Sequence, residues 1–309
     1  MKVYTSFKPV CEKPFFLTIG NFDGVHLGHQ ALLKALQENA RKDQVLSSVI
    51  TFSNHPSTVL QPNHRKPLIL SKEHKINLLD KIGIDYVFMV EFTLPFSHQS
   101  AEEFLRKIHA LCPFRRLILG QNAKLGNDRQ GDSPLMHRLA NELHYTLDFL
   151  PLESLTSEPI SSSRIRAAIQ NAEFLKAKAL LGRRYSIVGK AIHGKEHTTK
   201  SGYSTLNFSL KGLCHPPPGI YAVNVLYSQQ IYQAVAVLSL ASHDRMDLIP
   251  QLEIYLMNRN LDLYDQTFEI IFEEFIRPER IFRTQEELNS QFSKDMEQAK
   301  HILNNYNNT

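Results

Sequence analysis

Short hydrophobic runs alternate with amphipathic patterns over the first half of the chain. Runs rich in β-branched and aromatic residues predict strands at 15–19, 45–52, 85–90, 116–120 and 145–150. Between them, apolar residues recur every three or four positions, as in ALLKALQENARK and SAEEFLRKIHAL, which predicts helices. This alternation predicts an α/β fold with a doubly wound parallel sheet, whose ligand crevice lies at the carboxyl ends of the strands.

Farther along the chain, strand-like runs are separated by loops that contain Gly, Pro or Asn. The runs YSIVGKAI, GIYAVNVLY, IYQAVAVLSL, LEIYLM and TFEIIFEEF predict a compact antiparallel β-barrel or sandwich. A terminal helix follows, because Thr284 and Glu287 have the spacing of a capping box. We therefore predict two domains, residues 1–182 and residues 183–309, which meet at Gly182.

Composition narrows the class of protein only slightly. A length of 309 residues exceeds one ordinary core, and 42% hydrophobic with 21% charged residues is typical of a globular protein. The net charge of +4 suits anionic small molecules as well as nucleic acid. Cys11, Cys112 and Cys214 lie far apart without CxxC spacing, so we expect reduced thiols. With a charged start and no long apolar run in the sequence, we expect a cytoplasmic protein.

The stretch GNFDGVHLGH at 20–29 stands where the first predicted strand gives way to a helix. A helix that begins near His26 directs unpaired N–H groups and its positive dipole end toward the strand edge, which suits an anion. His26 and His29 would share one face of its first turn, and Gly28 would leave room for a ligand. Such a site suits a nucleotide undergoing phosphoryl or nucleotidyl transfer; two surface histidines at a helix start are the alternative.

A second charged cluster, SSSRIR, begins at Ser161 and precedes another apolar helical pattern. Its serines, Ser162 among them, are good N-cap residues, while Arg164 and Arg166 carry permanent charge near the predicted helix start. This cluster suits the β- and γ-phosphates of a nucleotide. A capped and solvated helix end is the alternative.

In the second half, STLN at 204–207 and Glu253 are the candidates for chemistry. Thr205 and Asn207 stand two apart on an extended segment, so their side chains share a face suited to Mg²⁺ or a phosphate oxygen. Glu253 lies within the strand-like LEIYLM and would suit a base that deprotonates an alcohol. A strand-edge hydroxyl and amide and a solvent-facing glutamate are the alternatives, and the residue patterns leave them open.

Three segments of the chain, in order, resemble motifs of the bacterial bifunctional riboflavin kinase/FAD synthetase family. The family's GxFDGVHxGH is present as GNFDGVHLGH, its TFxxHP as TFSNHP at 51–56, and its ISSTRIR as ISSSRIR at 160–166. The resemblance covers nearly the whole chain. It implies an FMN adenylyltransferase domain of the HxGH nucleotidyltransferase kind, followed by a riboflavin kinase barrel.

The resemblance also implies roles for residues of the first domain. His26 and His29 would stabilise the reacting phosphates of ATP. Further contacts to ATP are expected from Gly20, Asn21, Phe22, Asp23, Gly24, Gly28, Ser162, Arg164 and Arg166. Contacts to the flavin are expected from His55, Asn122 and Asp132. Ala123 and Leu125 replace aromatic residues of the family, so we expect the flavin to lose a stacking partner there.

For the barrel, the resemblance implies that Thr205 and Asn207 hold Mg²⁺ with ATP and that Glu253 deprotonates the ribityl 5′-hydroxyl of riboflavin. Gly194 and Gly202 would belong to a loop that covers the ATP phosphates. The family's PTAN reads STLN here, and two threonines replace a Gly-Arg pair in the loop, which stiffens it and removes a charge.

The resulting prediction is a two-step flavin cofactor enzyme that uses Mg²⁺. Riboflavin and ATP would give FMN and ADP, and FMN and ATP would then give FAD and pyrophosphate. The alternative is an active FMN adenylyltransferase whose second domain binds a flavin or nucleotide without catalysis. The intact motifs argue against a nonenzymatic flavin sensor, and the sequence has no KMSKS-like loop of an aminoacyl-tRNA synthetase. We expect small-molecule partners, no nucleic acid, no membrane, and a monomer or weak homo-oligomer.

Overall fold

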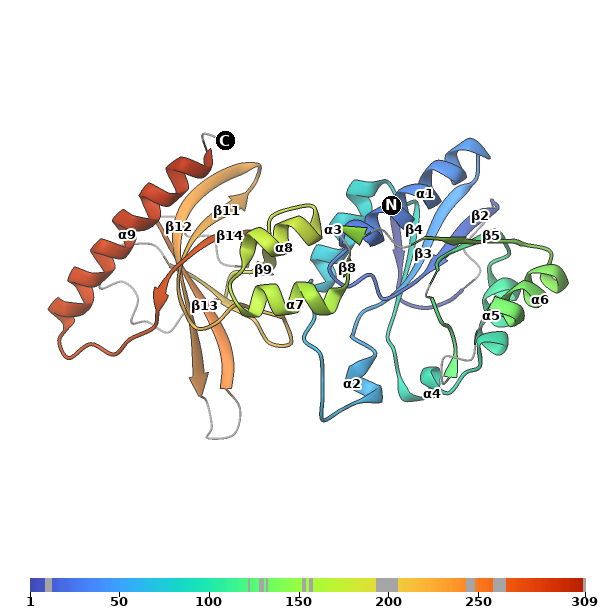
Figure 1. Ribbon diagram of the computed structural model, residues 1–309, viewed down its shortest axis with the longest axis horizontal. Helices are drawn as coiled ribbons and strands as arrows, with labels where there is room; N and C mark the ends of the chain where they lie inside the picture. Colours follow the sequence, from blue (N-terminus) through green and yellow to red (C-terminus); the bar gives the residue numbers. More distant parts are fainter. Residues whose placement is uncertain are drawn as a thin grey trace. The chain divides into compact units, whose positions relative to one another are not determined.

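The computed structural model describes residues 1–8, 13–121, 123–127, 131, 133–151, 154–155, 158–192, 205–242, 248–257 and 265–307. Contacts divide the chain into two compact units, Met1–Leu68 with Lys75–Ser162, and Ile69–His74 with Ser163–Thr309. The first unit holds a sheet with helices around it, and the second holds a curved sheet with one long helix (Figure 1).

Six strands of the described chain form the parallel sheet of the first unit, in the order β1-β4-β3-β2-β5-β6. They are β1 (Lys2–Tyr4), β2 (Phe15–Ile19), β3 (Leu46–Phe52), β4 (Tyr86–Val90), β5 (Phe114–Gly120) and β6 (Thr146–Leu150). From β2 the chain builds outward through β3 and β4, and then returns to the other side of β2 with β5 and β6. The carboxyl edge between β2 and β5 is therefore the switch point at which such sheets bind ligands.

All five residues of β2 are buried, which explains why FFLTI is an uninterrupted apolar run. Phe15, Leu17 and Ile19 belong to one core cluster with residues of α5 (Ala101–Leu111) and α6 (Ser133–Leu143). α1 (Leu27–Lys42) packs on β2, β3 and β5 and buries its Leu33 and Leu36. The predicted parallel sheet is confirmed, and β1 is an added edge strand that the sequence pattern did not predict.

Short elements complete the first unit. The single turns α2 (Ser57–Leu60) and α4 (Leu94–Ser97) follow β3 and β4, and α3 (Lys72–Ile82) precedes β4. β7 (Ser154–Leu155) and β8 (Glu158–Pro159) pair as a small antiparallel ladder. α5 begins with a capping box, in which the Glu103 backbone N–H donates to Ser100 Oγ at 3.1 Å and the Ser100 N–H to the Glu103 carboxylate at 2.9 Å.

Six strands of the described chain form the antiparallel sheet of the second unit, in the order β10-β13-β12-β11-β14-β9. They are β9 (Ser186–Lys190), β10 (Thr205–Ser209), β11 (Gly219–Tyr227), β12 (Gln230–Ser242), β13 (Leu248–Leu256) and β14 (Thr267–Pro278). Beyond the end of β9, the Ile192 backbone N–H donates to the Asn207 carbonyl at 2.9 Å. Because this bridge joins the two edges, the sheet nearly closes into the predicted barrel.

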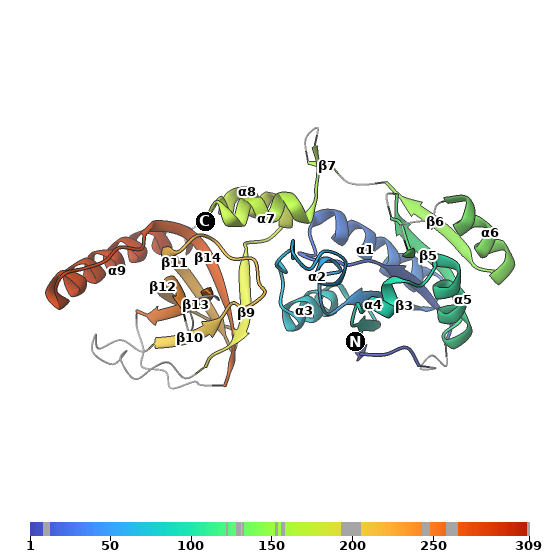
Figure 2. The same ribbon diagram turned by 90° about the horizontal axis from the view of Figure 1, so that it is seen from below.

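α9 (Gln285–Asn307) lies along the outside of the barrel (Figure 2). Its Met296, Ala299 and Leu303 pack with Ile220 of β11 and Val235 of β12. The helix begins as predicted, because the Glu287 backbone N–H donates to Thr284 Oγ1 at 3.1 Å.

α7 (Ser162–Gln170) and α8 (Phe174–Leu181) precede the barrel in sequence. α8 ends at Gly182, whose φ of 70° lies in the left-handed region that favours glycine, and whose N–H donates to the Lys178 carbonyl at 2.8 Å. Cys112 and Cys214 are buried and belong to no disulfide, and Cys11 lies outside the described residues.

Candidate functional site

The segment 20–29 leaves β2 as a tight loop and enters α1. Phe22, Gly24 and Val25 have positive φ angles of 47°, 87° and 39°. This region is disfavoured for a β-branched residue such as Val25, and backbone strain of this kind persists only where the surroundings impose it. The Val25 N–H donates to the Phe22 carbonyl at 3.2 Å, which closes the turn before the helix.

His26 and His29 lie together at the amino end of α1. His26 is the N-cap residue, and its Nδ1 accepts a hydrogen bond from the His29 backbone N–H at 3.3 Å. The two imidazole rings stack with their centroids 3.6 Å apart and their planes 16° apart. With Nδ1 accepting, a neutral His26 carries its proton on Nε2, where it can donate to a ligand.

Burial lowers the pKa of His29 well below its ordinary value, and the charges of His26 and Lys75 lower it further. His29 is therefore neutral at pH 7. Its Nδ1 is buried and has no hydrogen-bond partner among the described residues. An unpaired buried polar atom costs about 1–3 kcal/mol, so His29 is held here at a loss of stability.

A cavity of about 480 Å³ opens beside the histidine pair, within the size range of small-molecule sites. We call it the histidine cavity. Its lining includes Ile19, Gly20, Phe22, His26, Gly28, His29, Gly120, Ala123, Leu150, Ile160 and Ser162. A Cβ added at Gly28 would come 3.5 Å from the His26 ring, which is an ordinary contact. Protein packing therefore does not require this glycine, and its missing side chain leaves room in the cavity.

The second motif meets the loop through Ser162, whose Oγ donates to the Asp23 carbonyl at 2.9 Å. Asp23 itself is buried. Arg164 and Arg166 follow on α7 and belong by their contacts to the second unit. Arg166 is only 6% exposed although guanidinium groups are always charged.

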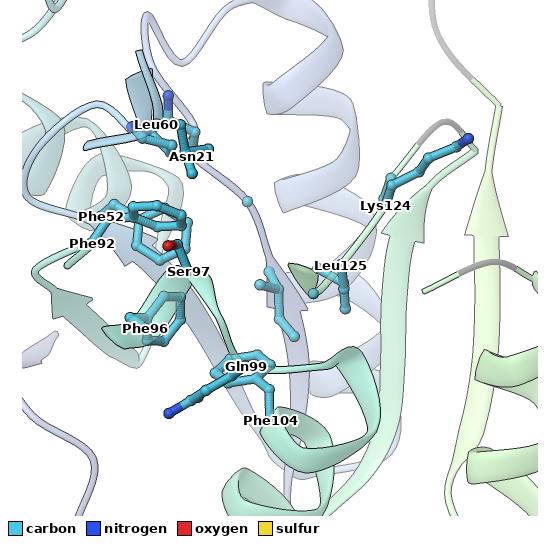
Figure 3. Close-up of a pocket in the computed structure, with 15 residues that line it drawn as sticks. Asn21, Phe52, Leu60, Phe92, Phe96, Ser97, Gln99, Phe104, Lys124 and Leu125 are labelled. Atoms are coloured by element: carbon cyan, nitrogen blue, oxygen red, sulfur yellow. The ribbon is translucent and has the colours of Figure 1, made fainter. Parts of the chain in front are cut away.

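A second cavity of about 310 Å³ is lined by Ile19, Gly20 and Ala123 as well, so the two cavities share a wall. We call it the phenylalanine cavity. Its lining also includes Asn21, Phe52, Pro56, Leu60, Phe92, Phe96, Ser97, Gln99, Phe104 and Leu125 (Figure 3). The Asn21 side-chain oxygen is buried and has no hydrogen-bond partner in the described part of the chain.

Aromatic rings make up one side of the phenylalanine cavity. The Phe96 ring lies 5.6 Å from that of Phe52, 5.4 Å from that of Phe92 and 5.4 Å from that of Phe104, between centroids. Ala123 and Leu125, where we expected the flavin to lose a stacking partner, line this cavity as well. The aromatic surface comes instead from β3, the loop after β4, α4 and α5.

The remaining residues predicted to contact the flavin lie elsewhere or outside the described residues. His55 does not line either cavity, and its Nδ1 accepts from the Ser57 backbone N–H at 3.0 Å. Asn122 and Asp132, and likewise Gly194 and Gly202 of the predicted phosphate loop, lie outside the described residues.

Lys75 of α3 is a buried cation that belongs to none of the predicted site residues. Its side chain is only 2% exposed, and burial lowers its pKa to about 8 although Asp23 raises it. Its Nζ donates to the carbonyls of Asn21 and Phe52, each at 2.9 Å. One feature of the sequence indicates its burial. Lys75 stands four residues before Leu79 and therefore lies on the same, buried face of the helix.

In the barrel, the register of β10 and β13 brings the predicted kinase residues together. Asn207 pairs with Glu253 and Thr205 with Tyr255. Side chains of directly paired residues lie on the same face of the sheet, so all four share one face. The Tyr255 hydroxyl donates to the Glu253 carboxylate at 3.0 Å. Burial raises the pKa of Tyr255, and the negative charge of Glu253 raises it further, so the hydroxyl keeps its proton and remains a donor.

This face fits the requirements of Mg²⁺ in part. The hydroxyl of Thr205, the amide of Asn207 and the carboxylate of Glu253 carry oxygen atoms, which Mg²⁺ prefers. Asn207 Nδ2 is buried and has no hydrogen-bond partner within the described ranges. No group of three or more His, Cys, Asp or Glu side chains in these ranges would hold a metal ion. The remaining ligands would therefore come from water and from the phosphates of a nucleotide, as is usual for Mg²⁺.

A helix amino terminus with paired histidines at the switch point of a parallel sheet defines a nucleotide-binding α/β domain, here followed in sequence by an antiparallel barrel. Residues 8–164 match the family model of FAD synthetase, and residues 181–303 match that of riboflavin kinase. The chain therefore belongs to the family of bifunctional riboflavin kinase/FMN adenylyltransferases, and the resemblance inferred from the motifs is confirmed.

Similar proteins cover nearly all of the chain. The bifunctional riboflavin kinase/FMN adenylyltransferase of Haemophilus influenzae is 32% identical over 93% of this chain and 94% of its own. That of Buchnera aphidicola is 31% identical, also over 93% and 94%. A crystal structure titled as a macrolide-efflux protein from Streptococcus pneumoniae has a TM-score of 0.81 and 25% identity, over 96% of this chain and 98% of that one. In the described part of this chain, no helix combines the length and apolarity needed to cross a membrane.

Proposed function

We propose that the chain makes FMN and FAD in two successive transfers. The barrel converts riboflavin and ATP to FMN and ADP, and the first site converts FMN and ATP to FAD and pyrophosphate. Both family matches support this assignment. The observation that carries it is the pair of adjoining cavities at the switch point, one beside two stacked histidines and the other lined by aromatic rings.

In the adenylyl transfer, ATP occupies the histidine cavity and the isoalloxazine of FMN occupies the phenylalanine cavity. An FMN phosphate oxygen then attacks the α-phosphorus of ATP near the shared wall, the bond to the bridging oxygen breaks, and pyrophosphate leaves. Backbone N–H groups of α1 and the rings of His26 and His29 stabilise the negative charge that grows on the α-phosphate. By their motif, we assign Ser162, Arg164 and Arg166 to the distal phosphates.

In the kinase reaction, Glu253 accepts the proton of the ribityl 5′-hydroxyl while the oxygen of that hydroxyl attacks the γ-phosphorus of ATP. Tyr255 holds the Glu253 carboxylate through its hydroxyl. Thr205 and Asn207 bind the nucleotide together with Mg²⁺, which neutralises phosphate charge when bound. By family motif, Gly194 and Gly202 cover the phosphates, and His55, Asn122 and Asp132 contact the flavin of the first site.

Incubation of the full chain with riboflavin, ATP and Mg²⁺, followed by chromatography, tests this proposal. We expect FMN to form first and FAD to follow with release of pyrophosphate. FAD formed from added FMN, without any FMN formed from riboflavin, would identify the barrel as a binding module without catalysis. No FAD from FMN and ATP would overturn the assignment of the first site.

We further propose residues 1–182 and 183–309 as the two functional domains. The first family match ends at residue 164, within the first turn of α7, and the second begins at residue 181, the last residue of α8, which Gly182 terminates. Cys112 and Cys214 belong to no disulfide, which supports a place in the reducing cytoplasm. We also propose that the chain is a monomer or a weak homo-oligomer.

A further inference from the structure

Lys75 joins the carboxyl ends of two neighbouring strands. Its Nζ donates to the Asn21 carbonyl, just beyond β2, and to the Phe52 carbonyl, the last residue of β3. The Thr51 hydroxyl donates to the same Asn21 carbonyl at 2.9 Å and lies 3.5 Å from Lys75 Nζ. The backbone that enters the strained turn at Phe22 is thus held by two donors from outside the loop.

A buried ammonium at this position is costly. The oxygens that accept from Lys75 are all neutral, and burial lowers its pKa from 10.5 to about 8. Between these values the folded chain binds fewer protons than the unfolded chain, so stability rises with pH across this window. Below about pH 8 Lys75 is charged in both the folded and the unfolded chain, so the folded chain carries the full cost of burying this charge. A lysine that is buried at a cost in stability departs from the usual exposure of lysines, and such departures point to function.

The charge of Lys75 acts on the histidine cavity, because it is one of the causes that lower the pKa of His29. A positive charge at this place also favours a negative ligand in the cavity. Among the described residues, the titratable groups that interact with the ammonium are Asp23 of the loop and His29 of α1, whose ring stacks on that of His26. β3 contributes only the neutral Thr51 hydroxyl and the Phe52 carbonyl.

We propose that Lys75 is a positioning residue for the adenylyl transfer. It holds the loop after β2 through the Asn21 carbonyl, and its buried positive charge favours the ATP phosphates beside His26 and His29. This inference rests on the function proposed for the first site. Lys75 does not line the histidine cavity, so it acts through the loop and through its electric field.

The pH dependence of kcat/KM for ATP, measured on the full chain as FAD formation between pH 6 and 10, tests this role. We expect kcat/KM to fall as pH rises through about 8, because Lys75 loses its charge, while FMN formation shows no such limb. Lys75→Met should lower kcat/KM by up to about 100-fold, because the loop is displaced, and should abolish the limb. The matched control Lys81→Met, an exposed lysine on the same helix, should change neither.

An NMR titration of His29 gives a second readout that a purely structural role would not move. We expect Lys75→Met to raise the pKa of His29, since a neighbouring positive charge is lost. Unchanged kcat/KM with the limb intact in Lys75→Met would overturn the proposal. If that variant does not fold, the wild-type profile decides, because a missing limb near pH 8 contradicts the role. If the wild type forms no FAD, the proposed function fails, and the His29 titrations of the wild type and Lys75→Met still decide whether the Lys75 charge acts at this site.

Discussion

The two candidate sites are built from different parts of the polypeptide. The first uses ends of elements, namely the carboxyl end of β2, a strained loop and the amino end of α1, so backbone groups supply much of its binding. The second uses one face of two paired strands, where the side chains of Thr205, Asn207 and Glu253 supply the binding and reacting groups. Changes at the first site should therefore act through the shape and charge of a cavity. Changes at the second should act through single side chains.

Of these changes, Glu253→Gln should produce the largest difference between the effects on the two reactions. Glutamine keeps an oxygen that accepts from Tyr255 but cannot take up the proton of an alcohol, so FMN formation should fall about 10²- to 10⁴-fold. FAD formation from added FMN should keep its wild-type rate, as measured by chromatography. Glu279→Gln, at an exposed position beyond β14, is the control. Equal losses in both reactions would refute a role confined to the kinase.

Gly28→Ala should impair the first site without harming the fold. The added methyl meets the His26 ring only at an ordinary contact distance but occupies space in the histidine cavity. Overpacking of this kind costs about 1–3 kcal/mol, so KM for ATP should rise roughly 5- to 150-fold. Thermal unfolding should show no loss of stability, because alanine favours helix. Glu38→Ala on the exposed face of α1 should leave KM unchanged, and an unchanged KM in Gly28→Ala would show that ATP binds elsewhere.

Phe96→Leu should weaken flavin binding at the first site only. Leucine keeps apolar contact but removes the ring that lies amid Phe52, Phe92 and Phe104. Loss of one aromatic contact is worth about 0.5–1.5 kcal/mol, which is roughly a 2- to 12-fold rise in KM for FMN. The KM for riboflavin in the kinase reaction should not move. Phe149→Leu, on β6 and outside both cavities, is the matched control.

The smallest expected effect is a pH dependence of stability from His29. Because its pKa is lowered in the folded chain, only the unfolded chain takes up this proton as pH falls below about 6.5. The wild type should therefore lose stability on acidification through this group, by less than about 1.4 kcal/mol per pH unit. His29→Asn should lose less than the wild type in unfolding experiments between pH 5 and 7. His137→Asn, at an exposed position, is the control. If this variant showed the same reduced loss of stability, the effect could not be assigned to the burial of His29.

Much of the fold could be predicted from the sequence, because its signals are local. The apolar run of β2, the capping box at Ser100 and the change of pattern near Gly182 each lie within a few neighbouring residues. β1 was missed, since Lys2–Tyr4 is short and shows no hydrophobic alternation by itself. Its pairing with β4 is a tertiary contact.

The candidate sites divide in the same way. GNFDGVHLGH is contiguous, so the histidine pair could be located from the sequence together with its helix start. The phenylalanine cavity could not be located from the sequence, because its rings come from separate segments that meet only in the folded chain. Lys75 escaped notice because lysine on an amphipathic helix is ordinarily solvated. The hydrogen bond from Tyr255 to Glu253 follows from the sequence spacing only once the strand is known.

The central claim is that two stacked imidazoles at the amino end of α1 stabilise the transfer of the adenylyl group. The most direct measurement is kcat for FAD formation from FMN and ATP by His29→Ala, beside the wild type, with thermal unfolding as the control for folding and FMN formation as the control for the second site. A loss of about 10²- to 10³-fold with normal FMN formation is predicted. FAD formation by the variant at the wild-type rate would contradict the claim.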